Sequence, residues 1–229
     1  MVESKGAVQH YFLCKDFVEK FARFFIFPAI FLICLCLPLN RADAAEATAP
    51  SEFSGKGPAE DRPWSAMLYT GLGTTSRLHE VLTFNVEPED SHFIGGVLNR
   101  QMSRFWQHFY FELEGQALKH FGEQNNWEFN GLFLIRFVTF PWDRIVDTSF
   151  AVGEGLSYAT EKPRIERDNH SGESTNLLNY LMFELAFAPP SHPEWALVTR
   201  IHHRSGIFGL FDGVNGGSNF LGLGLRYYF

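Results

Sequence analysis

The chain alternates between apolar and polar positions most strictly over its last nine residues. One side of an extended strand would carry the leucines and aromatics of this stretch, which are Leu221, Leu223, Leu225, Tyr227 and Phe229. The other side would carry Gly222, Gly224, Arg226 and Tyr228. This pattern is typical of a strand with lipid on one side and a crowded polar lumen on the other, and outer-membrane β-barrels usually end on such an aromatic residue.

Seven more segments of strand length precede this one, so eight strands are predicted. Their approximate bounds are Trp64–Gly73, His92–Gln101, Phe105–Gly115, Asn126–Thr139, Asp147–Ala159, Leu177–Ala188, Pro193–Ser205 and Ser218–Phe229. Within the segments an apolar row opposes a polar row, and each apolar row is long enough for a tilted strand to cross hydrocarbon. We therefore predict an all-β fold, an eight-stranded antiparallel transmembrane β-barrel of the outer membrane.

The connections between the predicted strands alternate in length. The long ones are polar or glycine-rich and cover residues 74–91, 116–125, 160–176 and 206–217. The short ones cover residues 102–104, 140–146 and 189–192. If the N-terminus lies in the periplasm, every long connection falls outside the cell, which is how outer-membrane barrels arrange their loops.

Charged residues within the predicted strands lie mainly on the inward-facing rows. They are Glu112, Glu114, Glu128, Arg136, Glu184, Arg200, Arg204 and Arg226. Eight strands close around an interior that side chains can fill, so these charges predict a paired lumen network and not a diffusion pore. Glu154 does not fit this pattern, because it shares the outward row of Phe150, Val152 and Leu156. A bulge at the flanking glycines, or a position at the membrane interface, would account for it.

The beginning of the chain predicts an export signal. Basic residues precede an apolar run from Phe24 to Leu39, and small residues follow it at Ala42 and Ala44. The run is short for a spanning helix, although the basic region before it is long, which leaves an uncleaved anchor as the alternative. We expect a signal peptide over residues 1–44, a flexible linker over 45–63 and a barrel over 64–229.

Cysteine usage and charge exclude several kinds of site. Cys14, Cys34 and Cys36 all lie in the predicted signal, so the exported chain would have no disulfide, no thiol nucleophile and no cysteine-based metal site. The formal net charge of −7 gives no indication of a nucleic-acid partner. We expect neither a metal nor an organic cofactor.

The seventh predicted strand carries the one constellation that suggests chemistry. His203 and Ser205 share its outward face, at the extracellular end, whereas His202 points into the lumen. A serine and a histidine two apart on one strand face can approach within hydrogen-bond reach, which is the minimum for a base-activated nucleophile. The alternative is an interfacial polar belt, but a lipid-facing His-Ser pair has little structural reason to exist.

This region resembles the lipid A 3-O-deacylases and related outer-membrane acyl hydrolases. The resemblance rests on the Ile-His-His-Arg-Ser stretch at 201–205, the glycine-rich loop after it and a final strand of matching length. It implies that His203 is the general base and Ser205 the nucleophile. The family's orienting acid corresponds to Asn219, which is not acidic, and Asp212 in the connecting loop is the alternative third member.

The same resemblance bears on the oxyanion hole. The family usually has an asparagine directly after the serine, and this chain has Gly206 there. The oxyanion would then be left to backbone N–H groups of the turn from Gly206 to Gly209.

Together these features predict an outer-membrane serine esterase that removes an acyl chain from lipopolysaccharide. Its expected partners are lipid A in the outer leaflet and, through the strand ending at Phe229, the outer-membrane assembly machinery; a homodimer is left open. Two rivals also remain open. One is a non-catalytic barrel that serves a structural or lipid-binding role, and the other is a lipid A acyltransferase, in which an alcohol replaces water as the acyl acceptor.

The topology can be tested with an epitope tag inserted within residues 160–176. Because this connection is expected outside the cell, antibody should detect the tag on intact cells. Detection only after permeabilisation would reverse the topology and place His203 at the wrong leaflet.

Overall fold

The computed structural model describes residues 61–229, apart from residues 84, 107 and 170–173. The predicted signal peptide over 1–44 and the predicted linker up to residue 60 lie outside the described residues. The described part of the chain consists of the barrel and its connections.

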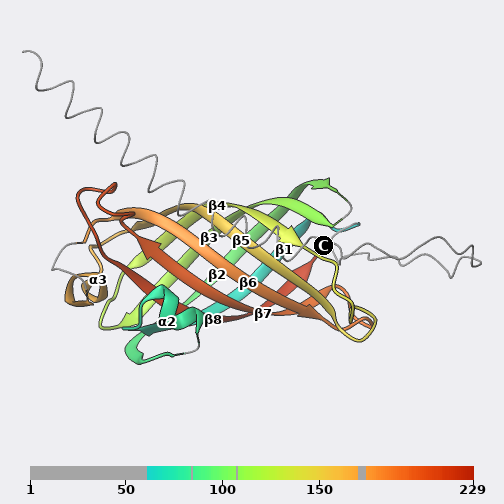
Figure 1. The fold of residues 1–229 in the computed structure, drawn as a ribbon, viewed down its shortest axis with the longest axis horizontal. Helices are drawn as coiled ribbons and strands as arrows, with labels where there is room; N and C mark the ends of the chain where they lie inside the picture. Colours follow the sequence, from blue (N-terminus) through green and yellow to red (C-terminus); the bar gives the residue numbers. More distant parts are fainter. Residues whose placement is uncertain (1–60, 84, 107, 170–173) are drawn as a thin grey trace, which may run out of the picture. The chain divides into compact units, whose positions relative to one another are not determined.

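The fold is a closed antiparallel β-barrel, in which each strand pairs with its neighbours in sequence and the last pairs with the first (Figure 1). The eight strands are β1 (Trp64–Thr74), β2 (Pro88–Phe105), β3 (Phe109–Gly122), β4 (Trp127–Phe137), β5 (Asp147–Ala159), β6 (Leu177–Ala188), β7 (Trp195–Ser205) and β8 (Gly217–Tyr228). The eight-stranded barrel predicted from the sequence is confirmed.

The hairpin between β2 and β3 differs from the sequence expectation. Residues 102–104, predicted as the short connection, belong to β2, which ends at Phe105, and β3 begins at Phe109. Residues 116–122, predicted as part of a long loop, continue β3, so only residues 123–126 connect it to β4. The reason is that Gln116 and His120 face the lumen and are buried there, so their polarity resembles that of a loop. The long connections are therefore 75–87, 160–176 and 206–216.

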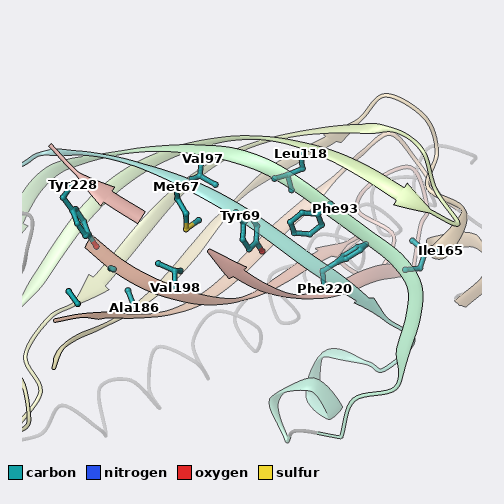
Figure 2. Close-up of a cluster of buried hydrophobic side chains, with 12 residues drawn as sticks. Met67, Tyr69, Phe93, Val97, Leu118, Ile165, Ala186, Val198, Phe220 and Tyr228 are labelled. Atoms are coloured by element: carbon teal, nitrogen blue, oxygen red, sulfur yellow. The ribbon is translucent and has the colours of Figure 1, made fainter. Parts of the chain in front are cut away.

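Side chains alternate between an apolar exterior and a packed interior along β1, β4 and β7 and over much of the other strands. In β1, for example, Leu68 is 65% exposed, whereas its neighbours Met67 and Tyr69 are 3% and 1% exposed. Aromatic rings fill part of the lumen, where the ring centroids of Tyr69 and Phe93 lie 4.8 Å apart and those of Phe93 and Phe220 lie 5.3 Å apart (Figure 2). Gly222 makes room for them, because a Cβ there would overlap the Tyr69 ring.

A charge network occupies another part of the lumen and is centred on Glu184 of β6. Its carboxylate accepts hydrogen bonds from Arg136 Nη1 at 2.8 Å, from Arg200 Nε at 2.5 Å and from Arg226 Nη1 at 2.6 Å. Glu112 and Glu114 of β3 complete the network by pairing with Arg136 and Arg200, respectively. Three carboxylates thus balance three guanidinium groups, which buried charges require. The predicted pairing is confirmed for these six residues, whereas Glu128 contacts His120 and Arg204 pairs with Glu166.

Two short helices lie in the connections at one end of the barrel, where the 206–216 connection also lies (Figure 1). They are α2 (Leu78–Leu82) and α3 (Arg164–Asn169). No helix in the described part of the chain is long and apolar enough to cross a bilayer.

Glu166 of α3 is buried and pairs with Arg204 of β7 at 2.6 Å. Burial raises the pKa of the Glu166 carboxyl, and the charge of Arg204 acts in the opposite direction. This ion pair fixes α3 to β7, the strand that carries His203 and Ser205.

The network centred on Glu184 should dominate the stability of the barrel. Glu184→Leu leaves three guanidinium groups with too little negative charge in a buried space. We expect the free energy of unfolding to fall by about 3–5 kcal/mol, as when one partner of a buried ion pair is removed. Equilibrium urea unfolding in lipid vesicles measures it.

Leu185→Ala is the matched control, because Leu185 is the next residue of β6 and faces the exterior. Its effect should stay within about 1 kcal/mol. Equal losses in the two variants would contradict a stabilising role for the network.

Candidate active site

The two faces of β7 divide as the sequence predicts. His203 and Ser205 belong to the outward row and are half-buried, whereas Arg200, His202 and Arg204 point inward and are buried. The pairing of β7 with β6 and β8 continues through this stretch with no register shift. His203 and Ser205 therefore lie on the same face, at the end of the strand that enters the 206–216 connection.

Asn219 of β8 is directly opposite His203 and contacts it. The Oδ1 atom of Asn219 lies 2.7 Å from Nδ1 of His203, and its Nδ2 donates to the backbone carbonyl of Ser76 at 2.9 Å. Only the amide nitrogen can donate to a carbonyl, so the amide oxygen must face the histidine and accept its Nδ1–H. The side chain of Asn219 thereby selects the histidine tautomer whose Nε2 carries no proton. This is the tautomer that can act as a base toward a serine.

The position of Asn219 depends on the connection between β1 and β2. Although Asn219 has outward parity, it is only 4% exposed. Ser76, whose carbonyl it binds, is fixed twice: its N–H donates to Thr74 Oγ1 at 3.0 Å, and its Oγ accepts from the Glu87 N–H at 2.9 Å. The orientation of the imidazole is therefore held by a chain of contacts that starts at the end of β1.

Ser205 ends β7 and begins a tight turn. Its Oγ accepts a hydrogen bond from the backbone N–H of Ile207 at 3.2 Å. Ile207 and Phe208 both adopt left-handed backbone conformations, with φ of 43° and 53°. Residues other than glycine rarely adopt this conformation, and such strained positions cluster at functional sites.

The structure does not support Gly206 and Gly209 as oxyanion donors. The N–H of Gly206 donates to the carbonyl of Gly216 at 2.9 Å, and the N–H of Gly209 donates to the carbonyl of Val214 at 3.0 Å. The backbone of this connection folds back closely on itself, and a Cβ on Gly206 would overlap the Val214 carbonyl. These glycines therefore allow two backbone segments to approach closely. Their N–H groups already donate hydrogen bonds within the connection.

Asp212, the alternative third member, does not occupy the orienting position. It is exposed in the 206–216 connection with φ of 52°, and the Nδ1 atom of His203 is bonded to Asn219 instead. In the part of the chain that the structure describes, no group of three or more His, Cys, Asp or Glu residues is arranged to hold a metal ion.

His202 belongs to the wall behind the site. It is fully buried, and its ring centroid lies 4.5 Å from that of Tyr180 and 5.4 Å from that of Phe93. Its Nε2 lies 2.9 Å from Glu128, off the line of a hydrogen bond, and Glu128 also contacts His120 at 2.9 Å. His202 therefore helps to fill the lumen behind His203.

Two contributors to the site were missed by the sequence analysis. The carbonyl of Ser76 is a backbone group in a loop, so no side-chain pattern could indicate it. Asn179 of β6 pairs directly with Ser205 and shares the outward row of Leu181 and Phe183, so the same parity argument could have found it.

Comparisons with known proteins identify no family for the chain. No protein-family model matches it, and no curated protein matches it. Among solved structures, the outer membrane enzyme PagL is 12% identical with a TM-score of 0.43, covering 71% of this chain and 98% of that chain. Neisserial surface protein A is 9% identical with a TM-score of 0.44, covering 72% and 96%. Similarities at this level say nothing about chemistry, which rests on the geometry described above.

The two adjacent histidines should differ sharply in their effect on the reactivity of Ser205. His203→Ala removes the group that can accept the serine proton, so labelling by a fluorophosphonate should slow by about a hundredfold or more without unfolding the barrel. His202→Ala should leave labelling largely intact and lower the thermal stability, because it creates a cavity in the lumen.

Ser205→Ala is the control for site-specific labelling. If His202→Ala slowed labelling and His203→Ala only lowered the thermal stability, the outward face of β7 would have been assigned wrongly.

Proposed function

We propose that this protein is an outer-membrane serine esterase that removes an ester-linked acyl chain from the lipid A part of lipopolysaccharide. The single observation that carries the proposal is the side chain of Asn219, whose amide is fixed by the carbonyl of Ser76 and directs its oxygen at His203 Nδ1. A histidine oriented in this way, two residues from a serine on the same strand face, matches the roles of base and nucleophile.

The proposed reaction uses Ser205 and His203 of the chain, together with water. As Nε2 of His203 takes the proton of Ser205, the serine Oγ bonds to the ester carbonyl carbon. Collapse of the tetrahedral intermediate breaks the bond to the sugar oxygen, which leaves with the proton from His203. Water then attacks the acyl-serine by the same route, which releases the fatty acid and restores the serine.

The location of the site favours a lipid substrate. His203 and Ser205 lie on the exterior of the barrel, and outward residues such as Leu197 and Leu223 are about half exposed on the same and the adjacent strand, at 50% and 52%. An ester held in a membrane can reach such a site laterally. The charged, filled lumen offers no route for it.

An asparagine in place of an acid changes the energetics without removing the mechanism. A neutral amide orients the imidazole as a carboxylate does, but it stabilises the positive imidazolium less. We therefore expect a slower enzyme whose activity depends strongly on the acceptor that Asn219 provides for His203.

Mass spectrometry of lipid A tests the proposal directly. Lipid A from cells that express the wild-type protein should lose one acyl chain, and lipid A from cells that express Ser205→Ala should not. Identical acylation despite folded barrels in both would support the structural or lipid-binding alternative. A gain of one acyl chain would instead indicate the acyltransferase.

Asn219 variants should separate its two contacts. Asn219→Leu removes both, so kcat should fall by about a hundredfold or more, because neither the tautomer nor the orientation of His203 is held. Asn219→Asp keeps the acceptor for His203 but loses the donor to Ser76. It should retain activity within about tenfold, while the barrel is destabilised by about 1–3 kcal/mol.

Asp212→Ala is the matched control and should match the wild type in rate, as measured by acyl release from purified lipid A. A loss of activity in Asp212→Ala that equals the loss in Asn219→Leu would transfer the orienting role to the loop.

A further inference from the structure

A carboxylate lies on the exterior of the barrel beside the proposed site. Glu154 has outward parity in β5, and its pairing with Phe133 of β4 and Leu181 of β6 is regular. The bulge that would have turned it away from the outward row is absent from both pairings. Its neighbours on the row, Val152 and Leu156, are apolar, so Glu154 interrupts an apolar wall where a charged group is costly.

Asn179 links this carboxylate to the strand that carries the serine. Its Nδ2 donates to Glu154 Oε1 and lies 3.3 Å from the carbonyl of Gly155. In the opposite direction Asn179 pairs directly with Ser205. Side chains of directly opposed residues on one face of a sheet are neighbours, with Cβ atoms about 5 Å apart. Glu154, Asn179 and Ser205 therefore form a polar row across three adjacent strands.

The second oxygen of Glu154 is buried without a hydrogen-bond partner among the described residues. An acceptor left unsatisfied beside an apolar wall costs stability unless a ligand or another group satisfies it. Because Asn179 holds Oε1, the carboxylate is fixed, and a donor from a ligand that enters beside the carboxylate would satisfy Oε2. Glu154 is not part of the charge network in the lumen. Its carboxylate is therefore better explained by ligand recognition than by a structural contact.

The spacing between Glu154 and Ser205 restricts what could be bound. Leu156 is the β5 position two strand spacings from Ser205, and Glu154 lies two residues farther along β5, which places Glu154 and Ser205 about 12 Å from each other. An ester at Ser205 and a donor at Glu154 must therefore belong to one molecule with a polar headgroup of sugar size. A hydroxyl or amide N–H on such a headgroup is the complement of an unpaired carboxylate oxygen.

We propose that Glu154 and Asn179 recognise a hydroxyl or amide donor of a glycolipid headgroup and position its ester at Ser205. This inference rests on the proposed function and names the specificity determinant of the same site. Glu154 is a positioning residue, since it acts on the part of the substrate that does not react. Phospholipids without such a donor would not bind at Glu154.

The test uses the full-length barrel in detergent micelles, in a Ser205→Ala background so that bound substrate is not consumed. Native mass spectrometry compares the retention of lipid A, which carries hydroxyl and amide donors, with that of phosphatidylcholine, which carries none. Glu154→Leu should weaken the retention of lipid A by about tenfold, the loss of one hydrogen bond to a charged group. Retention of phosphatidylcholine should not change.

Val152→Ala is the matched control, because it alters the same outward row on the side away from Asn179 and should leave both lipids unaffected. Equal retention of lipid A by Glu154→Leu and Val152→Ala overturns the proposal, and so does an equal loss of both lipids in Glu154→Leu.

Kinetics with Ser205 intact give a second readout. Glu154→Leu should raise KM for lipid A about tenfold while kcat for a simple acyl ester stays at the wild-type value. If kcat for the simple ester falls with it, Glu154 supports the fold of the site and the proposal is wrong. If the wild type hydrolyses neither substrate but the binding difference persists, the recognition site stands and the esterase proposal fails.

Discussion

The pairing of buried charges around Glu184 determines how the barrel closes. Its carboxylate, on β6, binds arginines from β4, β7 and β8, so it joins strands on different sides of the lumen. A slip of any of these strands by one residue would place an arginine on the apolar exterior and leave a carboxylate unpaired inside. The network therefore specifies register as well as contributing stability.

The orientation of the candidate site follows from that register. Arg200 and Arg204 must point inward, toward Glu184 and Glu166, and the pleat then forces His203 to the exterior. His202 fills the lumen between these two arginines. Two adjacent histidines thus have opposite environments for a purely geometric reason, and only His203 shares the exterior face of β7 with Ser205.

The fold could be predicted from the sequence because apolar and polar residues alternate along a strand wherever one of its faces is apolar. The prediction failed at 116–122, because Gln116 and His120 are polar residues that face the lumen and so resemble a loop. At the site, parity and register placed Asn219 opposite His203, and the structure shows that contact. The oxyanion assignment to Gly206 and Gly209 failed, since the hydrogen bonds of a loop backbone depend on its conformation and not on residue type. Ser76 contributes a carbonyl, which every residue has, so no sequence pattern could identify it.

The contact between Asn219 and Ser76 has a consequence for biogenesis. Asn219 belongs to the last strand and Ser76 follows the first, so their hydrogen bond crosses the seam at which the barrel closes. In a chain whose first and last strands have not yet paired, Asn219 lacks the Ser76 carbonyl that fixes which atom of its amide faces His203. If the site acts as proposed, its full reactivity belongs to the closed barrel, and a chain on its way to the membrane would react less with the lipids that it meets.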